Sequence, residues 1–295
     1  MFRQPSDPVR RRPVGGAPPP AGACNQGRSA VAQPLAPVGG PGGGFDEGGF
    51  DEGAGGGADG GPVTLLGLHP AGGSTAFFSG WQRALGERVN LVPVRIPGRD
   101  PAGGHCRQGL PRLVAELERD LGPLLERPYL LYGHSMGALL AYRLTRRRAE
   151  HGRRLPERLL VGAYPAPHLP HPLRRATRLT DAELVSWLVD FGSLPAALRA
   201  DTSWLSERIA LVRAEIGLCA GDSEGFTHRP LPCPVEVFAG RDDPLVSAAD
   251  AAAWAEHADG GFALHPVPGG HFFPRESKDA FFGRLGGLIA PLAAV

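Results

Sequence analysis

Short apolar runs bounded by Gly or Pro alternate with longer helical patterns over most of this chain, and this alternation limits the folds it can adopt. Parallel strands need a long crossover connection, usually a helix, so the order favours an α/β protein with a mainly parallel sheet flanked by helices. Each run is near the length of one strand. We predict strands over Val63–Leu68, Val89–Val94, Tyr129–Tyr132, Leu159–Ala163, Val235–Ala239 and Phe262–Val267.

Helical spacing of apolar residues predicts crossover helices over Gly109–Leu125 and Gly137–Glu150. The segment from about Pro167 to Pro232 instead holds helical patterns with no strand between them, and Thr180 and Glu183 form a capping-box pattern at the start of one helix. A second helix there carries one apolar stripe, made of Leu205, Ile209, Val212 and Ile216. Such an insertion would cover the carboxyl edge of the sheet, where ligands bind in open α/β folds. We expect a helical lid over about 167–232; the alternative is a cap that only completes the core.

The first 61 residues differ in composition from the rest. They are dominated by Gly, Pro and Ala and contain two copies of Gly-Phe-Asp-Glu-Gly between Gly44 and Gly53. They offer too little apolar surface to offset the entropy of ordering a chain. We expect a disordered extension over 1–61, either a passive linker, an artefact of the gene start or a docking segment, followed by one α/β domain over 62–295. Its arginine-rich start continues into Pro and Gly, where a secretory signal needs an apolar region.

Charge and cysteine usage narrow the classes of partner. The formal net charge is +1, so no overall basic field argues for nucleic acid or an anionic membrane as a partner. No apolar stretch approaches the roughly 18 to 20 residues of a membrane-spanning helix. The four cysteines lie far apart, without a CxxC pair or a His at metal-ligand spacing. We therefore expect a cytoplasmic, reduced protein without structural zinc.

The segment Gly133-His-Ser-Met-Gly137 lies between an apolar run and a helical pattern. Gly-x-Ser-x-Gly suits a sharp strand-to-helix turn, because the serine is held in a strained conformation and the glycines leave room for the neighbouring strand and helix. This context predicts the α/β-hydrolase fold, with Ser135 as a nucleophile exposed at the top of the sheet. His134 is expected to point away from the turn and to pack or hydrogen-bond beneath it.

A serine hydroxyl needs a base to take its proton, and the base needs a carboxylate to orient it. In α/β-hydrolases these partners follow the serine in the order acid, then histidine. His271, in the turn after the last apolar run, is the predicted base. The acid should follow the strand Val235–Ala239, where Asp242 and Asp243 are adjacent; we favour Asp243 and leave Asp242 open.

Charge that develops on the substrate carbonyl oxygen must meet fixed hydrogen-bond donors. Met136, the residue after the serine, should supply one backbone amide, and the loop after the first strand should supply the other. Pro70 has no amide hydrogen, so Ala71 is the predicted second donor.

Together these segments resemble the discrete type II thioesterases that accompany polyketide and non-ribosomal peptide synthases. The resemblance covers nearly all of Val63 to Leu292. The resemblance rests on the segments His69–Ser74, Pro93–Arg99, Gly133–Leu140, Ala166–His168, Leu179–Leu184, Asp242–Val246 and Gly269–Phe273. The long leader departs from the family pattern, and so does Gly162–Ala166, where the family usually carries basic residues.

The resemblance implies hydrolysis of acyl groups held on the phosphopantetheine arm of an acyl or peptidyl carrier protein, with no metal or cofactor. By position it implies the nucleophile Ser135, the acid Asp243, the base His271 and the oxyanion donors Ala71 and Met136. Two other hypotheses remain: an esterase or acyltransferase acting on small esters, which the same residues would support, and a non-catalytic binding protein of the same fold.

Overall fold

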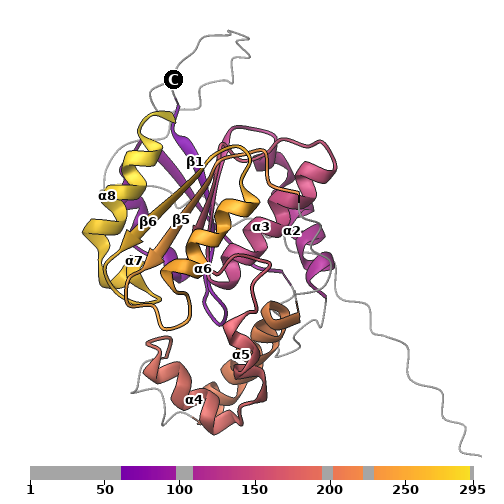
Figure 1. Cartoon of the computed structure of the whole chain (residues 1–295), viewed down its shortest axis with the longest axis vertical. Coiled ribbons are helices and arrows are strands. Elements are labelled where there is room, and N and C mark those ends of the chain that lie inside the picture. The colour runs from indigo at the N-terminus through magenta and orange to yellow at the C-terminus, as the bar shows by residue number, and fades with distance from the viewer. Residues whose placement is uncertain (1–60, 98–108, 195–201, 222–228, 293–295) are drawn as a thin grey trace, which may run out of the picture.

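Parallel strands form one sheet at the centre of the molecule. The structure is a computed structural model that describes residues 61–97, 109–194, 202–221 and 229–292. The sheet has 6 strands in the order β2-β1-β3-β4-β5-β6, and all neighbours are parallel (Figure 1). The strands are β1 Val63–Leu68, β2 Val89–Val94, β3 Tyr129–His134, β4 Arg158–Gly162, β5 Val235–Gly240 and β6 Phe262–Val267. The predicted α/β class and each predicted strand are confirmed, while the extension predicted over 1–61 lies outside the described residues except for Gly61.

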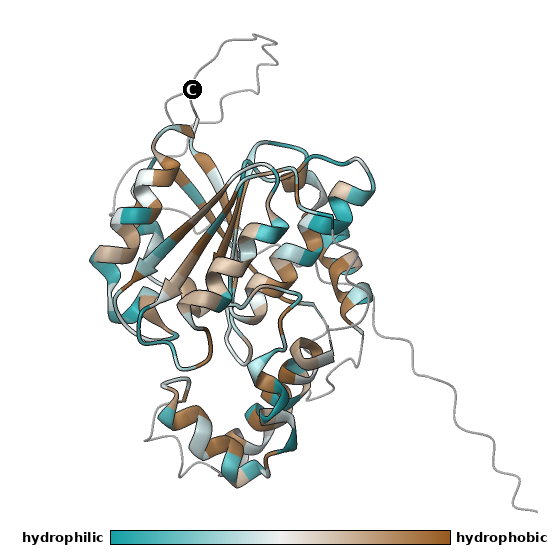
Figure 2. Ribbon diagram, viewed as in Figure 1, coloured by the Kyte–Doolittle hydropathy of each residue, from teal (hydrophilic) through white to brown (hydrophobic). Residues whose placement is uncertain are grey.

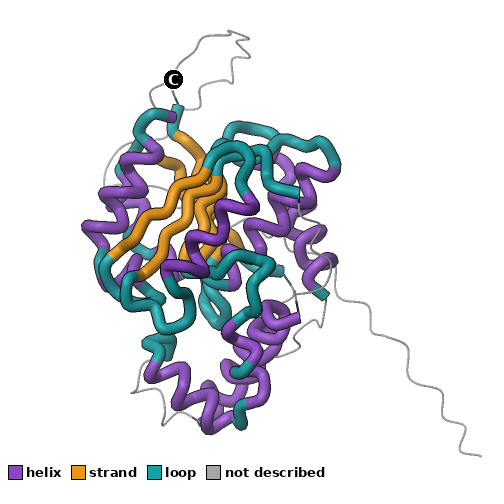
Figure 3. Tube along the Cα trace, in the orientation of Figure 1, coloured by secondary structure: helices purple, strands orange, loops and turns teal. Residues whose placement is uncertain are grey.

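Helices cover both faces of this sheet (Figure 3). The α-helices are α1 Trp81–Leu85, α2 Leu110–Leu125, α3 Met136–Glu150, α4 Asp181–Asp190, α5 Thr202–Gly221, α6 Ala248–Ala252, α7 Phe273–Glu276 and α8 Lys278–Ile289. Short 3-10 turns are η1 Thr75–Phe78, η2 Pro172–Arg174, η3 Ala176–Arg178 and η5 Ala253–His257. The predicted crossover helices correspond to α2 and α3.

Alternate residues of each strand feed two separate cores, because successive strand side chains point to opposite faces. Tyr129 and Leu131 of β3 join the core beneath α2 and α3, whereas Leu130 and Tyr132 join the core beneath α1 and α8. Burial on both faces explains why the inner strands are nearly continuous apolar runs, which are mostly brown in Figure 2. The edge strand β6 is only partly buried.

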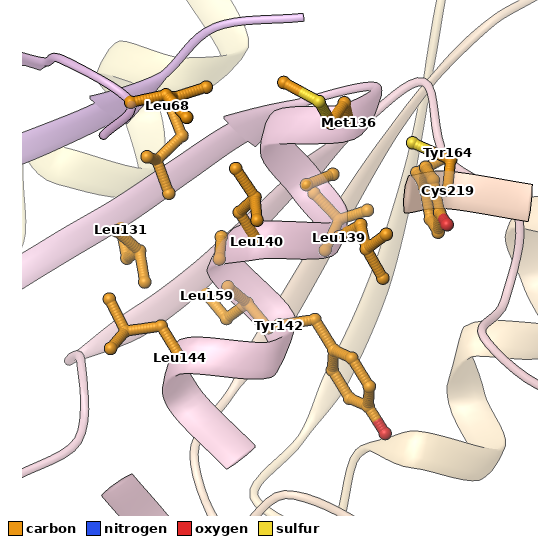
Figure 4. Close-up of a cluster of buried hydrophobic side chains, with 14 of the residues drawn as sticks. Leu68, Leu131, Met136, Leu139, Leu140, Tyr142, Leu144, Leu159, Tyr164 and Cys219 are labelled. Carbon is orange, nitrogen blue, oxygen red and sulfur yellow. The ribbon is translucent and has the colours of Figure 1, made fainter. Parts of the chain in front are cut away.

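Leucines of α3 fill the first of these cores. In Figure 4, Leu140 and Leu144 of α3 face Leu131 of β3, and all three are fully buried. Burying one such side chain contributes roughly 1.5–3 kcal/mol. This packing fixes α3 against the sheet and therefore fixes the chain at the start of α3.

The residues between β4 and β5 form the helical insertion, by which we mean the described part of 167–232. Its α4 and α5 lie beyond the sheet layers, below them in Figure 1, with α5 the nearer. The predicted capping box is present, since Glu183 N donates to Thr180 Oγ1 and Thr180 N donates to Glu183. Of the predicted stripe on α5, Ile209, Val212 and Ile216 are buried and Leu205 is half-buried.

The strand order reverses direction between β1 and β3, since the chain proceeds from β1 to β2 on one side and returns to β3 on the other. In open α/β sheets, ligands bind outside the carboxyl ends of the strands at such a switch point. Leu68 at the end of β1 is paired with Gly133 near the end of β3, so the loops that follow these two strands start side by side.

We expect Gly137→Ala to destabilise the fold. A Cβ at Gly137 would lie 2.1 Å from the carbonyl oxygen of Leu68, and backbone cannot move aside cheaply. The expected loss is about 2 kcal/mol or more in the free energy of unfolding, measured by denaturant titration. Gly286→Ala in α8 is the matched control, because a Cβ there meets no atom within 4 Å; it should stabilise by about 0.5–1 kcal/mol. Equal effects of the two changes would contradict the close approach of α3 to β1.

Candidate active site

Ser135 occupies the sharp turn between β3 and α3 with a φ of 53°, a backbone conformation that side chains rarely adopt. The turn is tight because strand and helix nearly touch: a Cβ at Gly133 would lie 2.1 Å from the carbonyl oxygen of Gly137. The Ser135 amide donates to the carbonyl of Gly162 on β4, at 2.8 Å. The serine side chain is thereby held at the carboxyl edge of the sheet, in front of the N-terminus of α3.

The loops after β5 and β6 bring a carboxylate and an imidazole together. His271 Nδ1 lies 2.8 Å from Asp243 Oδ2, and the two side chains are 3% and 0% exposed. The other oxygen, Asp243 Oδ1, accepts from the amides of Leu245 and Val246 at 2.8 and 3.3 Å. With the carboxylate as acceptor, Nδ1 carries its hydrogen and Nε2 of the neutral ring can accept a proton. Asp242 is exposed, so the structure places Asp243 and not its neighbour beside the histidine.

A buried polar chain runs from β3 to the His271 loop. His134 Nε2 lies 2.8 Å from the carbonyl oxygen of His271, and Tyr132 Oη lies 2.8 Å from His134 Nδ1. Because a carbonyl only accepts, Nε2 must carry the hydrogen and Nδ1 must accept from the tyrosine hydroxyl. The pKa of His134 is well below its usual value, since burial disfavours the charged ring. His134 thus hydrogen-bonds beneath the serine turn, as the sequence suggested, and also fixes the backbone of His271.

The loop after β1 holds its peptide groups in fixed directions. The carbonyl of Pro70 accepts from the amide of Gly73 and from His69 Nδ1, each at 2.9 Å. The amide of Ala71 belongs to the same planar peptide group as that carbonyl and points the opposite way. Met136 is the first residue of α3, so by position its amide has no partner within the helix. Ala71 and Met136 therefore follow neighbouring strands at the same sheet edge.

The helical insertion covers His271 directly. Phe191, at the end of α4, has its ring centroid 4.6 Å from that of His271 and is stacked on Trp187 at 5.0 Å. Sequence reasoning did not single out Phe191 or Tyr132. No local signal marks either one, because each acquires its role from a contact with a distant segment.

Metal ligands and membrane spans were also sought in the described ranges. Within them, no cluster of three or more His, Cys, Asp or Glu side chains could hold a metal ion. No helix in the same ranges is long and apolar enough to cross a membrane.

The six-stranded sheet with the Ser135 turn at its carboxyl edge defines an α/β-hydrolase. A family model described as the thioesterase domain matches residues 63–288. Thioesterase PikA5 of Streptomyces venezuelae is 30% identical over 217 residues, which are 72% of this chain and 75% of that protein.

Solved structures agree with the family match. The thioesterase RedJ from the prodiginine biosynthetic pathway of Streptomyces coelicolor is 32% identical, with a TM-score of 0.70 over 77% of this chain and 90% of that one. The type II thioesterase BorB from the borrelidin biosynthetic cluster is 32% identical, with a TM-score of 0.67 over 79% and 93%. The chain therefore belongs to the thioesterase family and, within it, to the type II thioesterases.

We expect Tyr132→Phe to destabilise the protein, because it leaves the buried Nδ1 of His134 without a donor. An unsatisfied buried acceptor costs about 1–3 kcal/mol, to be measured as the change in the free energy of unfolding. A change below about 0.3 kcal/mol, smaller than the typical contribution of one hydrogen bond, would contradict the assigned tautomer of His134.

Proposed function

We propose that Ser135, His271 and Asp243 form a catalytic triad that hydrolyses acyl thioesters held on the phosphopantetheine arm of an acyl or peptidyl carrier protein. The observation that carries the proposal is the hydrogen bond between His271 and Asp243, made at the sheet edge where Ser135 occupies its strained turn. Membership of the thioesterase family supports the reaction class.

The chemistry follows from the hydrogen bonding of this arrangement. Ser135 Oγ attacks the thioester carbonyl carbon while Nε2 of His271 takes its proton, and Asp243 stabilises the imidazolium that forms. The C–S bond then breaks, the thiol of the phosphopantetheine arm leaves with the proton from His271, and an acyl-serine ester remains. Water attacks this ester, with His271 again as base, and releases the carboxylic acid.

Two backbone amides are proposed as the oxyanion hole. Those of Ala71 and Met136 come from loops that start side by side after β1 and β3. Removing one donor of this kind costs about 3–4 kcal/mol of transition-state stabilisation in comparable sites. Fixed backbone donors need no reorganisation when charge develops on the carbonyl oxygen, which is why the rigidity of the loop after β1 matters.

We propose that the helical insertion is a lid that selects the acyl group. Phe191 lies against His271, and the insertion covers the edge where the acyl chain would have to lie. RedJ comes from the prodiginine biosynthetic pathway and BorB from the borrelidin biosynthetic cluster, and by analogy we propose an editing role for this chain on a polyketide or non-ribosomal peptide assembly line. We also propose a cytoplasmic location, since the thiols of Cys219 and Cys233 are buried and stand outside any disulfide, as expected for a reducing compartment.

The direct test is release of acyl groups from an acyl-phosphopantetheinyl carrier protein by the full chain and by Ser135→Ala. Loss of the nucleophile should lower kcat by on the order of 10⁴-fold or more. The matched acyl-CoA and a simple aryl ester serve as comparison substrates. Preference for the carrier-bound substrate supports the proposal, whereas serine-dependent turnover confined to the aryl ester would favour a small-ester esterase. A protein that turns over none of these and whose Ser135 resists a fluorophosphonate probe would be a non-catalytic binding protein.

Asp242 and Asp243 offer a matched pair of variants. Asp243→Asn removes the carboxylate that holds His271 Nδ1, and a change of this kind lowers kcat by about 10³–10⁴-fold. Asp242→Asn, one residue away and exposed, should change kcat by less than about twofold, since it contacts no proposed catalytic group. The comparison is made on the aryl ester at saturating concentration. A larger loss for Asp242→Asn would reassign the acid.

A further inference from the structure

A buried carboxyl group of the helical insertion is bonded to the loop that carries the proposed oxyanion donor. Glu215 of α5 is 5% exposed. Its Oε2 accepts a hydrogen bond from the amide of Gly72 at 2.6 Å, across 143 positions of sequence. A carboxylate is rarely buried to this extent unless its hydrogen bonds are satisfied. The proposed catalytic steps do not use Glu215, so its burial against the loop after β1 points to another role.

The bond acts on one of the two peptide groups that flank Ala71. The peptide group before Ala71 is held within the loop, by the bonds that the Pro70 carbonyl accepts. The peptide group after it contains the Gly72 amide, which donates its hydrogen bond to Glu215. Both ends of Ala71 are therefore fixed, one by the loop itself and the other by the insertion.

Packing supports the same contact. Gly72 has a φ of +65°, and a Cβ there would lie 2.5 Å from Cγ2 of Val212, one turn before Glu215 on α5. Glycine at this position satisfies the left-handed conformation and also leaves room for α5 to approach. In Figure 1, α5 lies nearer to the sheet than α4 does. The loop and the helix thus meet through one hydrogen bond and one close apolar contact.

We propose that Glu215 is a positioning residue that couples the seating of the helical insertion to the assembly of the oxyanion hole. This inference rests on the proposed function, in that Ser135 is the nucleophile and the Ala71 amide a donor to the oxyanion. When α5 is seated, Glu215 holds the Gly72 amide and Ala71 keeps its direction. When α5 moves away, the Ala71–Gly72 peptide group loses that restraint and only the loop's own bonds direct the Ala71 amide. The donor is then less well aligned, and hydrolysis is slower until the insertion closes on its substrate.

The test compares Glu215→Ala with Glu215→Gln. The alanine variant has no acceptor for the Gly72 amide, and we expect kcat on the aryl ester to fall about 10- to 100-fold with little change in KM, since removing a donor outright costs about 10²–10³-fold. The glutamine variant keeps an acceptor oxygen, and its kcat should stay within about fivefold of the original. A change in KM without a loss of kcat would overturn the proposal, and so would equal losses of kcat in the two variants.

A second readout separates positioning from a general structural effect. A trifluoromethyl ketone forms a tetrahedral adduct with a serine nucleophile, and its oxyanion occupies the oxyanion hole. Its affinity should fall in Glu215→Ala by about the same factor as kcat, because both report the same transition-state interaction. Unchanged affinity alongside a reduced kcat would contradict the coupling.

Ile289→Ala in α8 is the control for a general loss of stability. Ile289 is 2% exposed and lies in the core beneath α1 and α8, away from α5, so its loss should lower thermal stability through packing while leaving kcat and inhibitor affinity unchanged. Ser135→Ala in the same assays distinguishes a failure of the proposed function from a failure of the coupling proposed for Glu215. If activity survives in that variant, the proposed nucleophile is wrong; if activity depends on Ser135 but Glu215→Ala behaves as the original chain, only the coupling is wrong.

Discussion

Helix α3 approaches β1 and β3 so closely that a side chain at Gly133 or Gly137 would overlap backbone atoms, and the geometry of the site depends on this approach. It forces the sharp turn at Ser135, with its positive φ. Because β1 and β3 are paired at their carboxyl ends, it also brings the start of α3 next to the loop after β1. A wider gap would separate the serine and the Met136 amide from the Ala71 amide in the loop after β1. The reacting centre therefore depends on the absence of side chains at Gly133 and Gly137.

The rest of the site is joined to this turn by buried polar contacts. Asp243 holds the ring of His271, and His134 holds the backbone of the same residue. Such bonds are stronger in a buried environment than in water, but each leaves a costly unsatisfied group if its partner is lost. His134 is therefore neutral and has one defined tautomer, which makes it a rigid spacer between the serine turn and the histidine loop.

The sequence predicted the sheet well because strands buried on both faces appear as continuous apolar runs between Gly and Pro. It misplaced four strand ends by one or two residues, and the ends of β3 and β4 have a clear physical reason. β3 continues through His134, whose polar ring is satisfied by groups that no local pattern reveals, and β4 stops at Gly162 because Ala163 has a φ of 52°. The site residues were found from motif spacing and chain order, although their roles remain proposals.

Two contacts could not have been predicted in this way, and a third, that of Asp243, was predicted only as a preference over Asp242. Two adjacent aspartates look alike in sequence, and only the direction in which the turn after β5 leaves the strand separates Asp243 from Asp242. Phe191 and Glu215 belong to the insertion, whose helices could be recognised from their pattern but not docked. Their partners, His271 and Gly72, lie 80 or more positions away, and contacts at that separation are set by tertiary packing.

The contact between α5 and the loop after β1 has a consequence for how such proteins diverge and are recombined. A chimera that receives the insertion of a relative would inherit a new acyl-binding surface. The residue that the relative has at the position of Glu215 would decide whether the Gly72 amide still has an acceptor. Specificity and turnover would then change together, even with the sheet and its loops untouched. The insertion is for this reason not an independent module, and a successful graft must carry an acceptor at the position of Glu215.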